Sequence, residues 1–230
     1  MQRNDTVLAS HSRIKLAIFD IDGTFVHGDS FKRFCWFALR TNGIRLFRLW
    51  RLAFDALMYL TDGLDAGLLK VSCLRICLMN NDKAMLMSLV NSFVDGVLLK
   101  RLHSAAVDRL RRHKQENYTI IFLSASPDLY LNQLGSRFGV DRIICTKALS
   151  KDGQFTGELF SSNCKGDEKR RRLLEAYPAT EIAWDQSYGY GNSVEDVSFL
   201  ELLGNVVAVN PDAKLRRIAV QWNWAIEAWS

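Results

Sequence analysis

The sequence predicts an α/β fold: a parallel sheet with helices on both faces and an all-helical insertion between its first two strands. Apolar runs rich in β-branched residues, which are typical of short buried strands, recur at residues 15–19, 118–123, 142–146 and 205–209. Stretches with apolar residues at helical spacing separate these runs, and this alternation favours a parallel sheet. Between the first two runs, residues 30–97 show helical patterns and no evident strand.

The first predicted strand, Lys15–Phe19, ends in two acids, Asp20 and Asp22, and then in a Gly-Thr break. Ligands of parallel sheets gather beyond the carboxyl ends of the strands, and residues two apart in an extended segment point the same way. We therefore expect Asp20 and Asp22 to share one site. Two carboxylates this close repel each other, and hard oxygen ligands of this kind suit Mg²⁺. The alternative is that both acids cap a turn.

The sequence Asp-x-Asp-Gly-Thr after an apolar strand resembles the first motif of the haloacid dehalogenase superfamily, most of whose members are phosphatases. The resemblance implies a Rossmann-like core made of residues 1–27 and 101–230. It also implies that residues 28–100 form a helical cap, as in the phosphoserine-phosphatase-like members. Such caps close over the site and select the substrate, and their closure excludes water.

Helices are predicted in the insertion at residues 31–40, 44–59, 68–79 and 82–93, with Ser30 capping the first, and a further helix at residues 100–114. Asp29 lies where phosphoserine phosphatases carry an acid that recognises the substrate amine. The alternative role for Asp29 is a helix-capping turn with Ser30. Phe31–Phe34 and Ile44–Tyr59 interleave basic and aromatic residues, as membrane-surface helices do. The preferred interpretation is ordinary helices whose aromatic side chains pack inward.

The second predicted strand, Tyr118–Leu123, ends in Ser-Ala-Ser-Pro-Asp. A hydroxyl at a strand end can donate to a phosphoryl oxygen. The family's second motif is a Ser or Thr at this position, so the resemblance assigns that role to Ser124. Ser126, directly before Pro127, is predicted to cap the following helix.

A third strand is predicted at Arg142–Thr146 and a small hairpin at Gly153–Phe160. The family's third motif is a lysine at the start of the next helix, which neutralises the nucleophile and the phosphoryl group. Lys169 has the Gly-x-x-Lys spacing of the subgroup and is favoured over Lys165, which resembles other members. The three arginines at residues 170–172 are predicted to form a solvated helix face.

A strand-like run at Glu181–Trp184 precedes the sequence Tyr-Gly-Tyr-Gly-Asn-Ser-Val-Glu-Asp at residues 188–196. The family's fourth motif is Gly-Asp-x-x-x-Asp. Asn192 stands in place of its first acid, and Asp196 matches the second. Asparagine still offers a carbonyl oxygen to a hard cation. We therefore expect the metal site to persist and to bind Mg²⁺ more weakly than it would with an aspartate.

The resemblance implies a Mg²⁺-dependent phosphatase that works through an aspartyl-phosphate intermediate. Asp20 is then the nucleophile, Asp22 the general acid and base, and Ser124 and Lys169 bind the equatorial phosphoryl oxygens. The predicted metal residues are Asp20, Asp22 (through its backbone carbonyl), Asn192 and Asp196 (which orients a metal-bound water). The predicted substrate contacts are Asp29, Ser124 and Lys165.

Within this class, the predicted substrate is a small phosphorylated metabolite similar to phosphoserine. One alternative is a lipid phosphate of the phosphatidylglycerophosphate type, hydrolysed at the surface of an anionic membrane. An alternative of another class is a non-catalytic protein that binds a phosphorylated ligand or a partner, which Asn192 alone favours. Carbon–halogen cleavage is disfavoured because dehalogenases generally lack the acid at Asp22.

Composition excludes few classes of function. The net charge of +5 is compatible with an anionic substrate, a membrane surface or nucleic acid, but a single basic run is weak support for nucleic-acid binding, and none is expected. The five scattered cysteines lack a zinc-binding pattern and indicate reduced thiols in a cytoplasmic protein. No apolar run reaches transmembrane length, and the first residues lack an apolar signal core.

Overall fold

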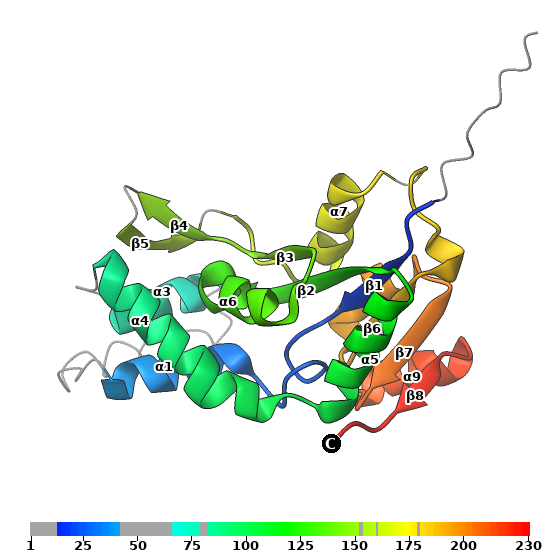
Figure 1. The fold of residues 1–230 in the computed structure, drawn as a ribbon, viewed down its shortest axis with the longest axis horizontal. Coiled ribbons are helices and arrows are strands. Elements are labelled where there is room, and N and C mark those ends of the chain that lie inside the picture. Colours follow the sequence, from blue (N-terminus) through cyan, green and yellow to red (C-terminus); the bar gives the residue numbers. More distant parts are fainter. Residues whose placement is uncertain (1–12, 42–65, 79–81, 152–153, 160, 179) are drawn as a thin grey trace, which may run out of the picture.

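The computed structural model describes residues 13–41, 66–78, 82–151, 154–159, 161–178 and 180–230. Its centre is a six-stranded sheet in which every neighbouring pair is parallel, with the order β3-β2-β1-β6-β7-β8 (Figure 1). The strands are β1 (Leu16–Phe19), β2 (Thr119–Pro127), β3 (Arg142–Thr146), β6 (Tyr188–Gly191), β7 (Asn205–Val209) and β8 (Ala225–Glu227). The predicted parallel sheet is confirmed.

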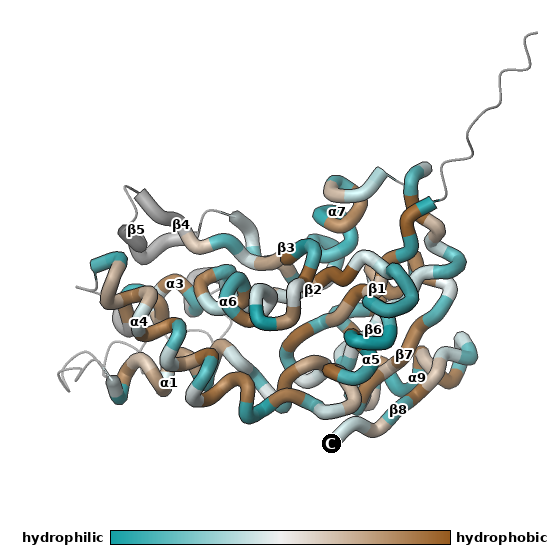
Figure 2. Tube along the Cα trace, viewed as in Figure 1, coloured by the Kyte–Doolittle hydropathy of each residue, from teal (hydrophilic) through white to brown (hydrophobic). Residues whose placement is uncertain are grey.

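Helices cover both faces of this sheet, as predicted. Successive side chains of β1 point to opposite faces of the sheet, so β1 contacts both layers of helices. Ala17 and Phe19 belong to a buried cluster with α5 (Ser104–Gln115) and α6 (Asp128–Phe138). Leu16 and Ile18 belong to a second cluster with α7 (Asp167–Ala176), α8 (Val197–Leu200) and α9 (Ala213–Gln221). The apolar strands therefore lie in the middle layer (Figure 2), where burial on both faces favours nearly continuous apolar runs.

The described part of the insertion between β1 and β2 is built from helices. It contains α1 (Ser30–Thr41), α3 (Ala66–Leu78) and α4 (Lys83–Phe93), and α4 continues through a π turn (Val94–Leu98) and a 3-10 turn (Leu99–Arg101). Phe34 of α1 and Phe93 of α4 both pack on Tyr130 of α6, with ring centroids 5.2 and 5.4 Å away. The insertion is thus anchored on one face of the core. The helix predicted at residues 44–59 lies outside the described residues, and the proposed domain boundaries stay a prediction.

The predicted helix at residues 100–114 begins later than expected. Leu102 is extended and bridges to Val26, and His27 N donates to Arg101 O at 2.7 Å. The chain therefore pairs with the segment after β1 before α5 starts at Ser104. Pairing between distant segments overrides the local helical pattern here.

Two strand predictions near the C-terminal half are corrected. At Glu181–Trp184, Ile182 forms one isolated bridge to Ile14 and a 3-10 turn follows at Trp184–Gln186. The strand that enters the sheet is β6, between β1 and β7. The hairpin consists of β4 (Ala148–Lys151) and β5 (Gln154–Leu159), so the prediction at Gly153–Phe160 covered its second strand alone, and β8 was not predicted.

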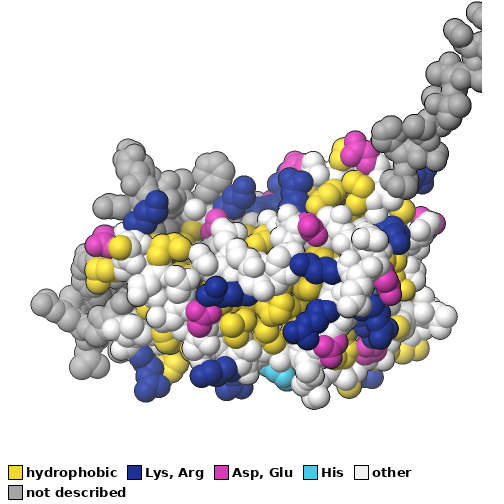
Figure 3. Space-filling model, viewed as in Figure 1, with side chains coloured by type: hydrophobic (Ala, Val, Ile, Leu, Met, Phe, Trp, Pro, Cys, Tyr) yellow, Lys and Arg dark blue, Asp and Glu magenta, His cyan; other side chains and the backbone are white. Residues whose placement is uncertain are grey.

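On the face of the molecule that Figure 3 shows, Lys and Arg side chains are dispersed among acidic and apolar ones. Within the described ranges no helix is both long and apolar enough to cross a membrane.

Candidate active site

The sheet order creates a crevice beside β1. After β1 the chain builds β2 and β3 on one side, and it later returns to the other side to build β6. The connections that follow β1 and β6 therefore diverge, and ligands of open parallel sheets bind at such a reversal of strand order. Asp20 directly follows β1, and Asn192 directly follows β6. The predicted acid and the amide of the fourth motif thus meet at one edge of the sheet.

A tight turn, not an extended segment, brings Asp22 to this edge. Asp20 N still donates to Tyr190 O at 2.9 Å, but Ile21 O already accepts from Phe25 N (3.0 Å) and Val26 N (2.9 Å). Gly23 sits in this turn with φ of 87°, and a Cβ there would lie 2.1 Å from Asn192 Nδ2. A left-handed conformation and this close approach both require glycine. The expected strand-like alternation of the two acids is therefore wrong, although they still share the site.

Asp20 is almost fully buried and carries one strong ion pair. It is 5% exposed; its Oδ1 accepts from Lys169 Nζ at 2.6 Å and its Oδ2 accepts from Thr24 Oγ1 at 3.1 Å. Burial, and then repulsion by Asp196, raise the pKa of Asp20 to about 7 against the opposing effect of Lys169. A cation in addition to Lys169 would favour the ionised carboxylate.

Lys169 is the lysine that reaches Asp20. Its Nζ lies 2.6 Å from both Asp20 Oδ1 and Asp196 Oδ1. Burial by itself would lower the pKa of Lys169, but Asp196 and Asp20 outweigh it and raise the pKa. Lys165 is half-exposed and pairs with Glu195 at 3.2 Å. Of the two candidate lysines, the geometry thus joins Lys169 to the acid of the first motif.

Asp196 binds Lys169 and also orients the loop after β6. Its Oδ2 accepts from Asn192 N and Ser193 N, both at 3.1 Å, and it closes a capping box with Ser193. Both carboxylate oxygens therefore already accept hydrogen bonds from this chain. Direct metal ligation by Asp196 stays a prediction.

Asp22 is held by two serines. Its Oδ1 accepts from Ser30 N at 2.6 Å and its Oδ2 accepts from Ser126 Oγ at 2.5 Å. The Ser30 hydroxyl in turn lies 2.9 Å from Tyr130 OH and 3.2 Å from Ser126 Oγ. Desolvation raises the pKa of Asp22 although both serines act in the opposite direction. A raised pKa favours the protonated form, which can donate a proton.

Ser126 belongs to this site, although it was predicted only to cap the following helix. The helix α6 begins after Pro127 without a side-chain cap, so the predicted capping role of Ser126 is wrong. Ser124 is also buried, and its Oγ accepts from Ser126 N at 3.0 Å. The spacing of two along β2 could have indicated that Ser124 and Ser126 lie close together.

Two roles were predicted for Asp29, a contact to the substrate and a helix-capping turn, and the contacts at the start of α1 support the capping turn. Its Oδ1 accepts from Lys32 N at 2.9 Å, and its Oδ2 lies 3.5 Å from Lys32 Nζ. Asp29 therefore makes the capping contact, while the Ser30 hydroxyl, which was expected to cap, faces inward. Asp29 still borders the hollow described next.

A hollow of about 770 Å³ opens above this edge of the sheet, between the core and α1 and α3. Asp22, Ser126 and Asn192 line its core side. Lys70 of α3 reaches across from the insertion, and its Nζ donates to Ala125 O and to Asn163 Oδ1, both at 2.7 Å. Burial lowers the pKa of Lys70 to about 8, although Asp22 and Asp29 favour its charge. Lys70 was not predicted, since its environment arises from contacts with residues far away in the chain.

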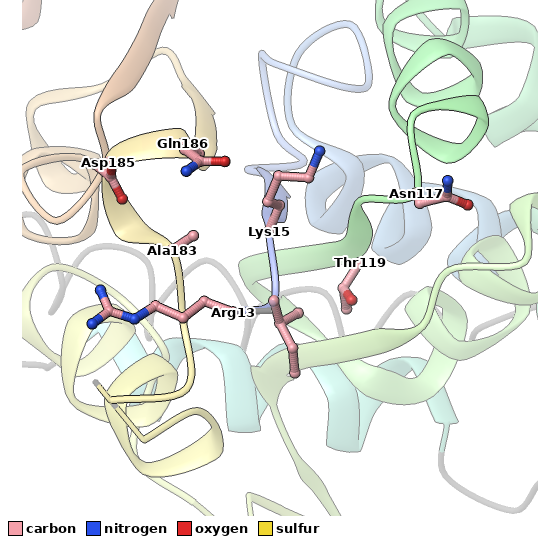
Figure 4. A pocket seen from close by; sticks show the side chains of 8 residues that line it. Arg13, Lys15, Asn117, Thr119, Ala183, Asp185 and Gln186 are labelled. Atoms are coloured by element: carbon pink, nitrogen blue, oxygen red, sulfur yellow. The ribbon is translucent and has the colours of Figure 1, made fainter. Parts of the chain in front are cut away.

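A second hollow, of about 670 Å³, lies at the opposite edge of the sheet, where β1, β2 and β6 begin (Figure 4). Lys15, Thr119 and Gln186 line it. The carboxyl ends of the strands, where ligands of such sheets bind, are at the other edge. The hollow beside Asp22 is therefore the better candidate for a catalytic site.

The oxygen atoms near Asp20 fit a hard divalent cation. Thr24 Oγ1 lies 3.1 Å from Asp20 Oδ2 and 3.4 Å from Asn192 Oδ1, and one hydroxyl proton can satisfy only one of these two acceptors. Within the described ranges no three His, Cys, Asp or Glu side chains gather as metal ligands. A cation here would thus depend on Asn192 and on backbone oxygen in addition to carboxylate.

Comparison with known proteins bears on this geometry. The family model "haloacid dehalogenase-like hydrolase" matches residues 17–201. A protein described as a probable phosphatase in Mycobacterium tuberculosis is 26% identical over 149 residues, which cover 65% of this chain and 52% of that protein. The chain therefore spans about half the length of the curated relatives that it matches first.

Solved structures share the fold. A protein of unknown function from Bordetella pertussis Tohama I superposes with a TM-score of 0.81 at 26% identity, and the match covers 94% of this chain and 98% of that one. A substrate-bound phosphoserine phosphatase superposes with a TM-score of 0.62 at 15% identity, covering 91% and 98%. At that identity the second likeness concerns the fold alone.

Proposed function

Because the chain belongs to the haloacid dehalogenase-like hydrolase family, we propose that it is a phosphatase that hydrolyses a phosphomonoester through an aspartyl-phosphate intermediate and requires Mg²⁺. The observation that carries this proposal is the buried Asp20 at the end of β1, paired with Lys169 at 2.6 Å. Asp22 lies in the same site with a raised pKa. A nucleophile and a proton donor with different environments are what a two-step phosphoryl transfer needs.

In the first step, an Asp20 carboxylate oxygen attacks phosphorus, and the bond between phosphorus and the ester oxygen breaks. Asp22 gives its proton to the leaving oxygen, and the alcohol departs. In the second step, water attacks phosphorus, Asp22 takes a proton from that water, and inorganic phosphate leaves with Asp20 restored. The hydrogen bonds from Ser126 and Ser30 orient the Asp22 carboxyl for both transfers.

The remaining predicted residues bind the phosphoryl group. We assign Lys169 and the Ser124 hydroxyl to the equatorial oxygens, where negative charge is spread in the transition state. Lys169 is already held by Asp196, so its ammonium is oriented before substrate arrives. Asp29 and Lys165 border the hollow and stay the predicted contacts to the rest of the substrate.

Mg²⁺ would be held by Asp20, by Asn192 and by the backbone carbonyl of Asp22, with Asp196 in the predicted outer position. When bound, it screens the negative charge between the nucleophile and the phosphoryl group. The convergence of Asp20 Oδ2 and Asn192 Oδ1 on Thr24 supports this choice. Because Asn192 replaces an acid, we expect weaker binding than at a site with aspartate there.

We propose that residues 28–100 act as a cap over the core. The support is that α1 and α3 line the hollow while Lys70 contacts the end of β2. A cap in this position would exclude water during the first step. The phosphoserine-like substrate, the lipid-phosphate alternative and the cytoplasmic location stay predictions.

The contact with an anionic membrane stays a prediction. Phe34 is buried against Phe93 and Tyr130, so the start of α1 packs inward as the preferred interpretation has it. The stretch Ile44–Tyr59 lies outside the described residues. Flotation with anionic liposomes tests this contact, and recovery of the protein in the unbound fraction would remove it.

Hydrolysis of para-nitrophenyl phosphate with Mg²⁺, and with a chelator in its place, tests the proposed function. We expect turnover with Mg²⁺ that the chelator abolishes. A protein that binds inorganic phosphate but releases none from the ester, at any Mg²⁺ concentration, would instead be the non-catalytic binding protein.

A further inference from the structure

The hollow beside Asp22 is larger and more apolar than phosphate binding requires. Its volume of about 770 Å³ lies in the range of pockets that enclose whole organic ligands, roughly 300–1,000 Å³. Its core side carries the polar residues Asp22, Ser126 and Asn192. The opposite side is an apolar wall, which we define by the residues Phe31, Cys35, Trp36, Leu39 and Cys73.

Four residues of the apolar wall lie on one face of α1. Phe31, Cys35 and Leu39 follow at intervals of four, and Trp36 adjoins them. The buried residues Phe34 and Ala38 lie beside Phe31 and Cys35 on this helix. Phe31, Cys35 and Leu39 also pack partly against the same core cluster. The apolar surface of α1 is therefore one wide stripe that faces the core at Phe34 and Ala38 and continues to the residues that line the hollow.

Trp36 is the most exposed part of this wall, with 63% of its surface accessible. A single exposed aromatic residue needs no explanation. Here, however, it continues an apolar surface that borders a catalytic carboxyl, and contiguous exposed apolar surface commonly marks a ligand-binding groove. The position of Trp36 thus favours a ligand that covers it.

The ionic groups around the hollow already have partners within the chain. Asp29 binds Lys32, and Lys165 pairs with Glu195. Lys70 donates to a backbone carbonyl and to Asn163. An amino-acid leaving group, with its ammonium and carboxylate, would have to compete for these charges, whereas an apolar leaving group would leave each of them in place.

Resting on the phosphatase activity proposed above, we infer that the natural substrate is a phosphomonoester of an apolar alcohol, whose hydrocarbon part packs on the apolar wall. The reaction is the same hydrolysis. The bond between phosphorus and the ester oxygen breaks, Asp22 protonates that oxygen, and the apolar alcohol is released. The wall contributes binding energy, since each methylene group that leaves water adds to the affinity.

A series of soluble monoalkyl phosphates, from methyl to hexyl and below the concentration at which they form micelles, tests this inference. O-phosphoserine and para-nitrophenyl phosphate complete the panel. We expect kcat/KM to rise with chain length by up to roughly fourfold per methylene group, and to be lowest for O-phosphoserine. The Trp36→Ala variant should have a shallower dependence on chain length than the wild type.

Trp222→Ala is the matched control. Trp222 is likewise an exposed tryptophan, 43% accessible, and it lies outside the hollow at the end of α9. Its variant should keep the wild-type dependence on chain length. Both substituted side chains are exposed, so both variants should fold.

The possible failures are distinguishable. Turnover of para-nitrophenyl phosphate with a flat chain-length profile, or with O-phosphoserine as the best substrate, overturns this inference and leaves the proposed function standing. An unchanged profile in Trp36→Ala overturns the apolar wall as the binding surface. Absence of hydrolysis across the whole panel overturns the proposed function and this inference together.

Discussion

The ionised form of Asp20 destabilises the folded protein, and an asparagine in its place would not. It is 5% exposed, and its pKa rises from 3.8 to about 7, chiefly through burial. The folded protein therefore holds this proton more tightly than the unfolded chain does. For such a group, the contribution to folding is most favourable when the carboxyl is protonated, and it is lost as the pH rises from the unfolded toward the folded pKa.

The size of this effect follows from the shift. A difference of about 3 pKa units corresponds to about 4 kcal/mol between the fully protonated and fully ionised limits. Between about pH 5 and pH 8, a single group with these two pKa values loses about 2–3 kcal/mol. In metal-free buffer, wild-type stability should thus fall relative to Asp20→Asn by this amount over that interval. Turnover in the variant should also fall, by at least about 10³-fold, because the nucleophile is gone.

Urea unfolding of both proteins at several pH values in the presence of a chelator measures the first quantity, and para-nitrophenyl phosphate hydrolysis measures the second. Saturating Mg²⁺ should reduce the pH-dependent difference, since a bound cation favours the ionised carboxylate. A stability difference that stays constant between the two pH limits would refute the electrostatic argument. Turnover near the wild-type rate in Asp20→Asn would refute the nucleophile assignment.

Three further substitutions probe the rest of the site. Lys169→Met leaves two buried carboxylates without their shared ammonium, and it should lower the free energy of unfolding in urea by about 3–5 kcal/mol at neutral pH. Lys165→Met removes one partner of an exposed ion pair and should change this free energy by less than about 1 kcal/mol. Equal effects of the two substitutions would contradict the assignment of Lys169 as the buried partner of Asp20. Gly23→Ala should lower turnover and thermal stability, because a Cβ at this position would lie 2.1 Å from Asn192 Nδ2. Gly96→Ala is the control and should change neither quantity, because no atom lies within 4 Å of a Cβ placed there. Asn192→Asp should lower the Mg²⁺ concentration needed for half-maximal turnover, because it adds a negative charge beside the cation; an unchanged or higher requirement would argue against ligation at this position.

Local sequence patterns were sufficient for most strands and helices. The runs at β1, β2, β3 and β7 are largely apolar, which is typical of strands buried on both faces. The start of α4 was also predictable, since Asp82 accepts from Met85 N at 2.8 Å as an N-cap should. These features depend on residues within one turn or one strand of each other.

Errors occurred where distant segments meet. β6 is a glycine-rich run with a weak local strand pattern, and it becomes a strand because β1 and β7 flank it. The predicted cap at Ser126 failed for a similar reason, since Asp22, 104 residues earlier, is there to accept its hydroxyl. A single sequence does not state such pairings, because they follow from strand order and packing.

By itself, the sequence determined that Asp20, Asp22 and Ser124 follow or end apolar runs, whereas Asn192 was located by its motif alone. The tertiary structure alone decided which of them touch. It joined Lys169 to Asp20 across 149 residues, turned Asp22 toward Ser126, and set the apolar face of α1 opposite them. The physical reason is that composition and periodicity act along the chain, whereas the contacts and pKa shifts of a buried site depend on the low-dielectric surroundings that only the packed fold supplies.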